Sequence, residues 1–363
     1  MERKNLELQC KPDFSKCMDR VYAWYDQEII DRVPVRFSEH NASHNVDLAE
    51  TLKRFPSIQA YWYDVDYQIS AFRSSIRGKK LLGETFPIYY PNLGPGVYAA
   101  YYGCGLTFSE VTSWTNHNIE DLSSFELTQL KLDRGCEYWR KIEELTDAAL
   151  AACPGEFMVG YTDLHPSIDC VVDWYGPEKL CMDMLMNPEL VKDVVDVAWR
   201  DFGAVFRHYH DKLFAHGQLS ASWMAIPFDG PMHIPSCDFS TLISPRMFAE
   251  FCLEYIQKEV KLAQYNIFHV DGPGVMKHLD ALMEIPEIRA FQLVQGVAAD
   301  EPILQWVPLI KRVQAAGKSL VISLKLEELE AFMGAISPKG LYLTLAADNE
   351  LQPDILKKLL KWK

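Results

Sequence analysis

Eight short apolar runs recur along the chain, and their residues do not alternate between apolar and polar. A half-exposed antiparallel strand would show that alternation, whereas a strand buried on both faces reads as a continuous apolar run. The sequence therefore predicts buried, parallel strands over residues 33–37, 86–90, 157–161, 219–223, 266–270, 288–293, 319–324 and 341–345.

Helical stretches separate these runs and are clearest in the second half of the chain. Residues 187–189 (NPE) provide an N-cap, a proline at the first helical position and an acid in the first turn. Apolar residues then repeat along one helical face as far as Leu213, and Gly217 follows as a stop, which predicts one helix over 188–213. Further helices are expected from Pro245 onward and over 274–283, 303–316 and 326–333.

Eight strands, each followed by a helix, fit a (β/α)8 barrel or a doubly wound sheet, and the count of eight favours the TIM barrel. Residues 1–32 are predicted to be an N-terminal helical extension, with its helix over 14–30, and residues 33–363 to be the barrel as one domain. The stretches 50–85 and 97–156 are too long for simple connections. We expect them to be insertions that elaborate the mouth of the barrel.

The composition is that of a soluble globular protein, since 48% of the 363 residues are hydrophobic and 24% are charged. A formal net charge of −14 makes nucleic acid and anionic membranes poor partners. The chain has no apolar run long enough to span a bilayer and no signal-peptide pattern at its start. Nine scattered cysteines without a C-x-x-C pair indicate reduced thiols, so a cytoplasmic location is expected.

Polar and titratable residues stand just after most of the predicted strands. In a barrel the carboxyl ends of all strands gather at one rim, where the chemistry takes place. A single acid there is as often a helix N-cap, but the convergence of several such residues favours an enzyme site. Asp169 and Asp238 stand in these loops without an assigned role. The candidate site residues from this rim are Glu39, Asn92, Asp163, His165, Trp223, Asp229, His269, Asp271 and Gln295.

Two pairs on this rim share one spacing. His269 and Asp271 are alternate residues at the end of the fifth strand, so their side chains face the same side. They form half of a metal site or an acid/base pair, unless Asp271 caps the next helix and His269 bonds to backbone. Asp163 and His165 repeat the spacing after the third strand and are the candidate catalytic pair. Their alternative is a turn shaped by the proline that follows.

Four residues are candidate substrate contacts, namely Asn92, Trp223, Asp229 and Gln295. Asn92 lies in a PNLGPG loop, where it could bind a ligand, although asparagine beside proline and glycine is also ordinary turn chemistry. The loop lacks the Lys and Ser/Thr of a P-loop, which disfavours phosphate binding.

Three ordered segments of the chain resemble the uroporphyrinogen decarboxylase superfamily. Residues 174–197 are similar to its G-x-E-x-L…D-P-E-x-V pattern, residues 237–255 to its S-P-x-x-F-x-x-F segment, and residues 269–285 to its H-x-[CD]-G segment. The resemblance covers the chain well from Asp163 onward and is weak before residue 85. It implies a (β/α)8 barrel with one of two activities. These are decarboxylation of tetrapyrrole acetate groups and corrinoid-linked methyl transfer in which zinc activates a thiol.

The sequence departs from both branches of that superfamily. The first strand carries only Arg36 where the decarboxylases have an arginine-rich segment, which argues against a polyanionic tetrapyrrole. Asp271 stands where the methyltransferases have a zinc-binding cysteine, and no cysteine follows the eighth strand. Losing both thiolates puts a thiol acceptor in doubt, while histidine and carboxylates still suit a metal that acts on an oxygen or nitrogen group.

The working hypothesis is a corrinoid-dependent methyltransferase that takes a methyl group from a small substrate. His269 and Asp271 would bind zinc or another divalent metal, with Asp163, His165 and Glu39 as catalytic residues. The chain has no D-x-H-x-x-G motif, so a corrinoid would come from a partner protein or from solution. The alternatives are a carboxy-lyase acting on a tetrapyrrole or a smaller acid, and a non-catalytic barrel that binds a ligand or corrinoid.

Overall fold

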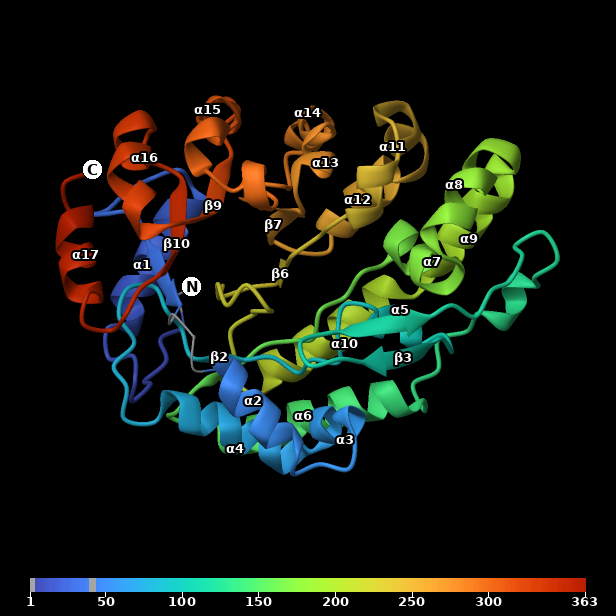
Figure 1. Ribbon diagram of the computed structural model, residues 1–363, viewed down its shortest axis with the longest axis horizontal. Helices are drawn as coiled ribbons and strands as arrows, with labels where there is room; N and C mark the ends of the chain where they lie inside the picture. The colour runs from blue at the N-terminus through green and yellow to red at the C-terminus, as the bar shows by residue number, and fades with distance from the viewer. Residues whose placement is uncertain (1–3, 39–43) are drawn as a thin grey trace.

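The computed structural model describes residues 4–38 and 44–363. Its largest sheet contains β1 (Val35–Ser38), β6 (Met232–His233), β7 (Tyr265–Val270), β8 (Ala290–Leu293), β9 (Ser319–Leu324) and β10 (Leu341–Ala346). All six strands are parallel, in the order β1, β10, β9, β8, β7, β6. The sheet curls into a half-barrel, and a row of helices covers its outer face (Figure 1).

The longest ladder of this sheet joins β9 and β10. Leu341 lies opposite Leu320 and Leu345 opposite Leu324, and all but one side chain of β9 is buried. Helices cover the outer face of the curled sheet, and its inner face is turned toward the sheet's own strands. Water is therefore excluded from both faces, which is why these strands read as continuous apolar runs. The prediction of buried parallel strands is confirmed for this half of the chain.

The other predicted strands form much shorter ladders. β2 (Ile88–Tyr89) and β5 (Met158–Val159) make a separate two-stranded parallel sheet. The strand predicted over 219–223 is wrong, because only Ser220 forms a bridge there, antiparallel to Phe228. Ala225 has a left-handed φ of 54°, and the chain turns back on itself at that point. The described residues thus form an α/β fold around a six-stranded half-barrel. The eight regular strands of the predicted TIM barrel are not found among them.

The two insertions fold into helices and one hairpin. The first holds the end of α2 (His44–Leu52) together with α3 (Ile58–Tyr63) and α4 (Val65–Ile76). The second holds α5 (Val97–Ala100), the antiparallel strands β3 (Gly105–Phe108) and β4 (Ser113–Asn116), η1 (Leu127–Gln129) and α6 (Glu137–Ala152). The hairpin has no apolar run, since its eight residues are mostly polar or small, and no strand was predicted there.

The helix predicted over 188–213 is two helices, α9 (Pro188–Arg200) and α10 (Phe202–Ala215). Asp201 separates them, and its carboxylate accepts a hydrogen bond from the Tyr102 hydroxyl at 3.0 Å. Aspartate competes with the backbone for hydrogen bonds and is therefore a common break between helices. The remaining elements are α7 (Ser167–Tyr175), α8 (Pro177–Met186), η2 (Asp238–Leu242), α11 (Pro245–Phe251), α12 (Leu253–Val260), α13 (Pro273–Met276), α14 (Leu279–Met283), η3 (Ala298–Asp300), η4 (Ile303–Trp306), α15 (Val307–Ala315), η5 (Leu326–Glu328), α16 (Leu329–Ala335) and α17 (Gln352–Leu359). No helix among the described residues is long and apolar enough to cross a membrane.

The N-terminal extension contains α1 (Phe14–Tyr25), which ends five residues before the predicted end. Gln27 takes a left-handed φ of 57° and breaks the helix there. The Trp24 indole N–H donates to the carbonyl of Leu320 at 3.0 Å, and the Ser319 hydroxyl donates to the carbonyl of Trp24 at 2.6 Å. The helix therefore packs against the amino ends of the central strands, opposite to the candidate site.

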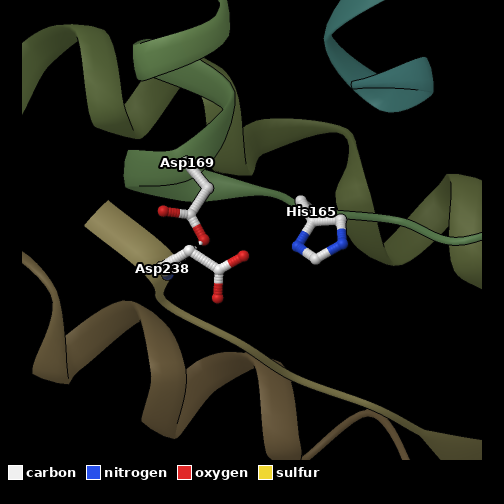
Figure 2. Close-up of side chains that lie close together, drawn as sticks. All are labelled: His165, Asp169 and Asp238. Atoms are coloured by element: carbon white, nitrogen blue, oxygen red, sulfur yellow. Dashed lines mark hydrogen bonds between the residues drawn. The ribbon is translucent and has the colours of Figure 1, made fainter. Parts of the chain in front are cut away.

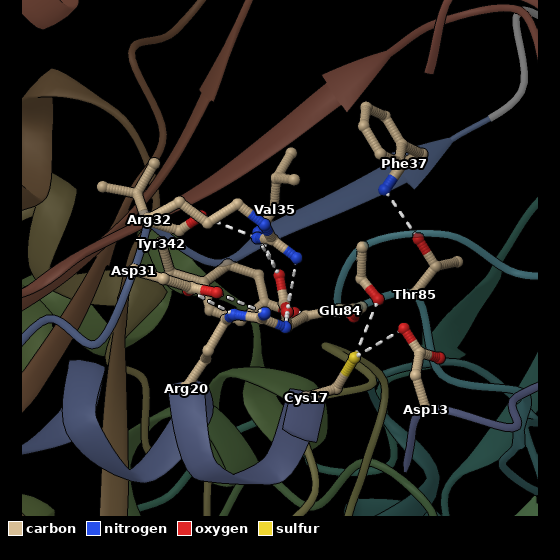
Figure 3. Close-up of polar contacts among 12 residues, drawn as sticks. Asp13, Cys17, Arg20, Asp31, Arg32, Val35, Phe37, Glu84, Thr85 and Tyr342 are labelled. Carbon is tan, nitrogen blue, oxygen red and sulfur yellow. Dashed lines mark hydrogen bonds and ion pairs between the residues drawn. The ribbon is translucent and has the colours of Figure 1, made fainter. Parts of the chain in front are cut away.

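A buried ion network ties this extension to the first strand (Figure 3). The carboxylate of Glu84 has no exposed surface and accepts hydrogen bonds from Arg32 at 2.7 and 2.9 Å and from Arg20 at 3.2 Å. It also accepts the backbone N–H of Val35 at 2.7 Å. A buried carboxylate needs such partners, because without them its desolvation is uncompensated. The network fixes α1 relative to β1.

Candidate active site

Five titratable side chains converge where the strands β5 and β7 end. Potential ligand atoms of His165, Asp169 and Asp238 lie within 4.8 Å of one another, and so do those of Asp238, His269 and Asp271. Figure 2 shows the first group, in which Asp169 and Asp238 face each other beside the His165 ring. The two groups share Asp238. They thus form one continuous cluster, named the His/Asp cluster below.

Each member of the cluster is positioned by a different element. His165 lies in the segment after β5, and Asp169 is in the first turn of α7. Asp238 is the first residue of η2. His269 belongs to β7, and Asp271 follows the end of that strand. Both oxygens of Asp169 accept backbone N–H groups of η2, those of Asp238 and Phe239, at 3.0 Å each.

His269 is held as a neutral imidazole with one free nitrogen. Its Nδ1 lies 2.6 Å from Oε1 of Gln292, which is its register partner on β8. Because the amide oxygen can only accept, Nδ1 carries the proton and Nε2 keeps its lone pair. Burial lowers the pKa of His269, which further favours the neutral form. The Nε2 atom lies 3.9 Å from Oδ1 of Asp271, on the side where Asp238 stands.

His165 is held in the opposite protonation state. Its Nε2 lies 2.9 Å from Oδ2 of Asp163, and its Nδ1 lies 2.7 Å from Oγ of Ser236. Burial alone would lower the pKa of His165, but the carboxylate of Asp163 raises it well above its ordinary value. Burial likewise would raise the pKa of Asp163, and the His165 cation keeps it below its ordinary value. The two residues form an ion pair, so His165 is a poor ligand for a cation.

The carboxyl groups of Asp169 and Asp238 hold a proton more tightly than ordinary aspartates. Burial and then repulsion from Asp238 raise the pKa of Asp169 to about 6. Burial and then repulsion from Asp271 raise the pKa of Asp238 to about 6, against the pull of His165. Groups that titrate so close to neutrality can give or take a proton at working pH. The same repulsion would be relieved by a cation.

Strained backbone and unpaired polar atoms surround the His/Asp cluster. Ser167 has a left-handed φ of 62°, and its buried hydroxyl has no hydrogen-bond partner among the described residues. The buried Oγ1 of Thr162 and Nε1 of Trp223 likewise have no hydrogen-bond partner among the described residues. The Trp223 ring meets the His269 ring edge-on at 5.2 Å and 86°. Such strain and unsatisfied groups concentrate at functional sites.

The structure brings together five of the residues predicted from the sequence, namely Asp163, His165, Trp223, His269 and Asp271. Gln295 is at the same end of the sheet but lines another cavity, of about 300 Å³, with its amide bonded to the carbonyl of Ser323. Asn92, predicted as a substrate contact or else as part of a turn, makes the turn contact, since its Oδ1 accepts the N–H of Gly94 at 2.8 Å. Glu39 lies outside the described residues.

Asp229 is placed away from the cluster. Its carboxylate accepts the backbone N–H of Lys4 at 2.8 Å, and its own N–H donates to the Tyr22 hydroxyl at 2.7 Å. It therefore sits beside the N-terminal extension, at the amino ends of the strands. The cause is the reversal at Ala225, which returns the chain to that end before it reaches β6.

Three functional candidates had no assigned role in the sequence analysis, namely Asp169, Asp238 and Gln292. Asp169 and Asp238 stood in rim loops, but only the contact between α7 and η2 reveals that they face each other. Gln292 carried no signal of its own. Its role depends on the register of β7 and β8, which the sequence alone does not give.

Comparisons with known proteins support the fold. No protein-family model matches the sequence, and no curated protein shows significant similarity to it. Among solved structures, the chain is similar to a methyltransferase from Methanosarcina mazei. The TM-score is 0.59, the sequence identity is 12%, and the alignment covers 95% of this chain and 98% of the other. At that identity the likeness establishes a shared fold along nearly the whole length of the two chains, and the superfamily assignment stays a prediction.

Proposed function

We propose that this chain is a methyltransferase that moves a methyl group from a small methylated substrate, assisted by a divalent metal at the His/Asp cluster. The single observation that carries the proposal is the free Nε2 of neutral His269, which faces the carboxylates of Asp238 and Asp271. The fold shared with a methyltransferase supports the choice of reaction. A corrinoid from a partner protein would be the methyl acceptor.

The residues present fit a divalent ion such as zinc. Asp238, His269 and Asp271 offer one nitrogen and two carboxylate oxygens, and three protein ligands are the number found in catalytic zinc sites that keep an open position. Gln292 fixes the ring of His269 by its second nitrogen, as outer-shell partners of metal-binding histidines do. A bound ion would supply a Lewis acid that polarises an oxygen or nitrogen of the substrate.

The neighbouring residues would position the substrate and handle protons. The His165 cation and Asp163 form a fixed ion pair beside the cluster. Asp169 is close enough to neutral titration to hold a proton near the leaving group. The unpaired N–H of Trp223 is available as a donor to a bound substrate. A cavity of about 160 Å³, lined in part by His165, Asp169 and Asp238, gives access to these groups.

The test combines metal content with turnover. Protein purified without chelators should hold about one divalent ion per chain, and His269→Ala and Asp271→Ala should lose it, because each removes a ligand. His216→Ala is the matched control, since His216 is an exposed histidine bonded to the carbonyl of Lys212. The same preparations are assayed for methyl transfer to reduced cobalamin from methylated amines, ethers and thiols. Absence of both metal and transfer in the wild type would refute the proposal.

A carboxy-lyase is the second candidate, and the pKa values of about 6 for Asp169 and Asp238 favour it. Decarboxylation requires a group that returns a proton to the product carbanion, and either aspartate could do so near neutral pH. Release of carbon dioxide from small carboxylic acids, without methyl transfer and independent of metal, would select this reaction.

A further inference from the structure

A second cavity, of about 260 Å³, lies beside the His/Asp cluster, in the part of the molecule built by the two insertions. Its walls come from α3, the end of β2, α6 and the turn between β3 and β4. Four of its lining residues are aromatic, namely Tyr61, Trp62, Tyr89 and Tyr90. One is acidic, Glu110, and none of the described residues that line it is basic. This volume suits a small ligand.

Two polar groups of this wall are bonded within the protein. The Trp62 indole N–H donates to the carbonyl of Ser109 at 2.9 Å, which also fastens the hairpin over the cavity. The Gln68 amide donates to the carbonyl of Tyr61 at 2.8 Å. The Tyr61 ring is supported by the rings of Phe55 and Tyr67, at 5.5 and 5.4 Å. What remains for a ligand is aromatic surface, three phenol hydroxyls, the amide N–H groups of Asn92 and the carboxylate of Glu110.

A cavity lined by aromatic rings and one carboxylate favours a positively charged ligand. The faces of tyrosine and tryptophan rings carry partial negative charge and attract ammonium groups, best when those groups carry methyls and bind little water. Glu110 adds a full negative charge, and the whole chain carries −14. An anionic ligand would meet no compensating cation here. We propose that this aromatic cavity binds the methylated ammonium group of a small substrate.

The aromatic cavity adjoins the segment that carries Asp163. The N–H of Gly160 donates to the carbonyl of Tyr89 at 2.7 Å, so the strand that leads to Asp163 runs beside the cavity wall. Burial, and after it the charge of Asp163, raises the pKa of Tyr90 to about 12, so the Asp163 carboxylate acts on a phenol that lines the cavity. The role of the ligand as methyl donor rests on the function proposed above, whereas the binding of a methylated ammonium group in this cavity is independent of that function.

The test is calorimetric titration of the full-length protein with choline, tetramethylammonium and the neutral analogue of choline in which carbon replaces nitrogen. Both cations should bind, and the neutral analogue should bind at least about tenfold more weakly, because it has the same shape without the charge. Equal affinity for choline and its analogue, or no binding of either cation, would overturn the assignment.

Variants locate the binding and separate it from the metal site. Glu110→Gln should weaken choline binding severalfold, and because Glu110 is exposed the fold should tolerate the change. Glu126→Gln, an exposed acid outside the lining, is the matched control and should bind as the wild type does. An unchanged affinity in Glu110→Gln would reject this cavity as the site. His269→Ala should lose metal yet keep choline binding, so failure of the metal proposal and failure of this one give different results.

Discussion

The two halves of the molecule are built differently, and the His/Asp cluster spans the boundary between them. β7, β8, β9 and β10 form long ladders with regular register, and His269 is placed by that register against Gln292. On the other side β2 and β5 are two residues long, and the backbone holds left-handed residues at Ser167 and Ala225. The regular half supplies a fixed ligand. The irregular half supplies Asp169, which titrates near neutrality, and the cavity lined by aromatic residues.

The largest expected effect concerns the buried network that ties α1 to β1, the first strand of the regular sheet. Glu84→Ala removes the fully buried carboxylate and leaves Arg32 without its partner. Loss of one member of a buried ion pair costs about 3–5 kcal/mol of unfolding free energy. Glu189→Ala, which breaks an exposed pair with Lys192, should cost less than about 1 kcal/mol. Urea unfolding of both variants measures the difference, and similar midpoints would contradict it.

The next effect tests the regular half. Gln292→Leu removes the acceptor that fixes the His269 tautomer, without touching a metal ligand. Outer-shell substitutions of this kind cost about 10–100-fold in metal affinity. Competition with a chromogenic chelator measures that affinity. Gln295→Leu, on the same strand end but away from the cluster, should leave it unchanged.

The third prediction uses the titration of the His/Asp cluster. Because the folded pKa of Asp238 is raised to about 6, its protonation competes with metal binding, and affinity should fall about tenfold per pH unit below that value. Lowering the pH has the opposite effect on the unfolding free energy of the metal-free protein, which it raises. The raised pKa means that its contribution is favourable at low pH and is lost as pH rises through about 6.

Thermal melts of metal-free wild type and Asp238→Asn check that sign. The amide cannot ionise, so the variant should be the more stable protein at pH 7.5, and its advantage should shrink as the pH falls from about 6 toward the ordinary aspartate value of 3.8. A constant difference between the two proteins across this range would show that Asp238 titrates elsewhere.

The smallest effect concerns the strained backbone. Ser167→Gly should raise unfolding free energy by about 1 kcal/mol, because glycine takes a left-handed φ at little cost. Turnover should fall if the unpaired Ser167 hydroxyl contacts substrate. Ser123→Gly, at an exposed serine outside this segment, is the control for the loss of a side chain. A less stable Ser167→Gly protein would show that the strain is not stored at this residue.

The same division explains what the sequence could predict. The runs at 266–270, 319–324 and 341–345 match β7, β9 and β10 to within one residue, because burial on both faces leaves an unbroken apolar signal. The run at 219–223 (LSASW) is weaker, because serines alternate with its apolar residues. The chain reverses just after it at Ala225, and a single left-handed alanine leaves no mark in the sequence. The hairpin of β3 and β4 was missed because its residues are small or polar.

For the site too, residues on one strand could be paired from the sequence, whereas residues brought together by tertiary contacts could not. His269 and Asp271 could be paired from spacing along one strand, and the structure places them 3.9 Å apart. Asp238 could not be joined to them, since it approaches through η2 and not along a strand. The protonation states of His165 and His269 differ because one meets a carboxylate and the other an amide, and both partners are set by tertiary contacts.

The hydrogen bond between Trp24 and Leu320 joins residues 296 positions apart. During synthesis, α1 leaves the ribosome long before β9 exists, so Trp24 lacks its partner on that strand for most of translation. Contacts between residues so distant in sequence form slowly, because the loop they close is long. Docking of the Trp24 end of α1 is thus a late step in the folding of this chain.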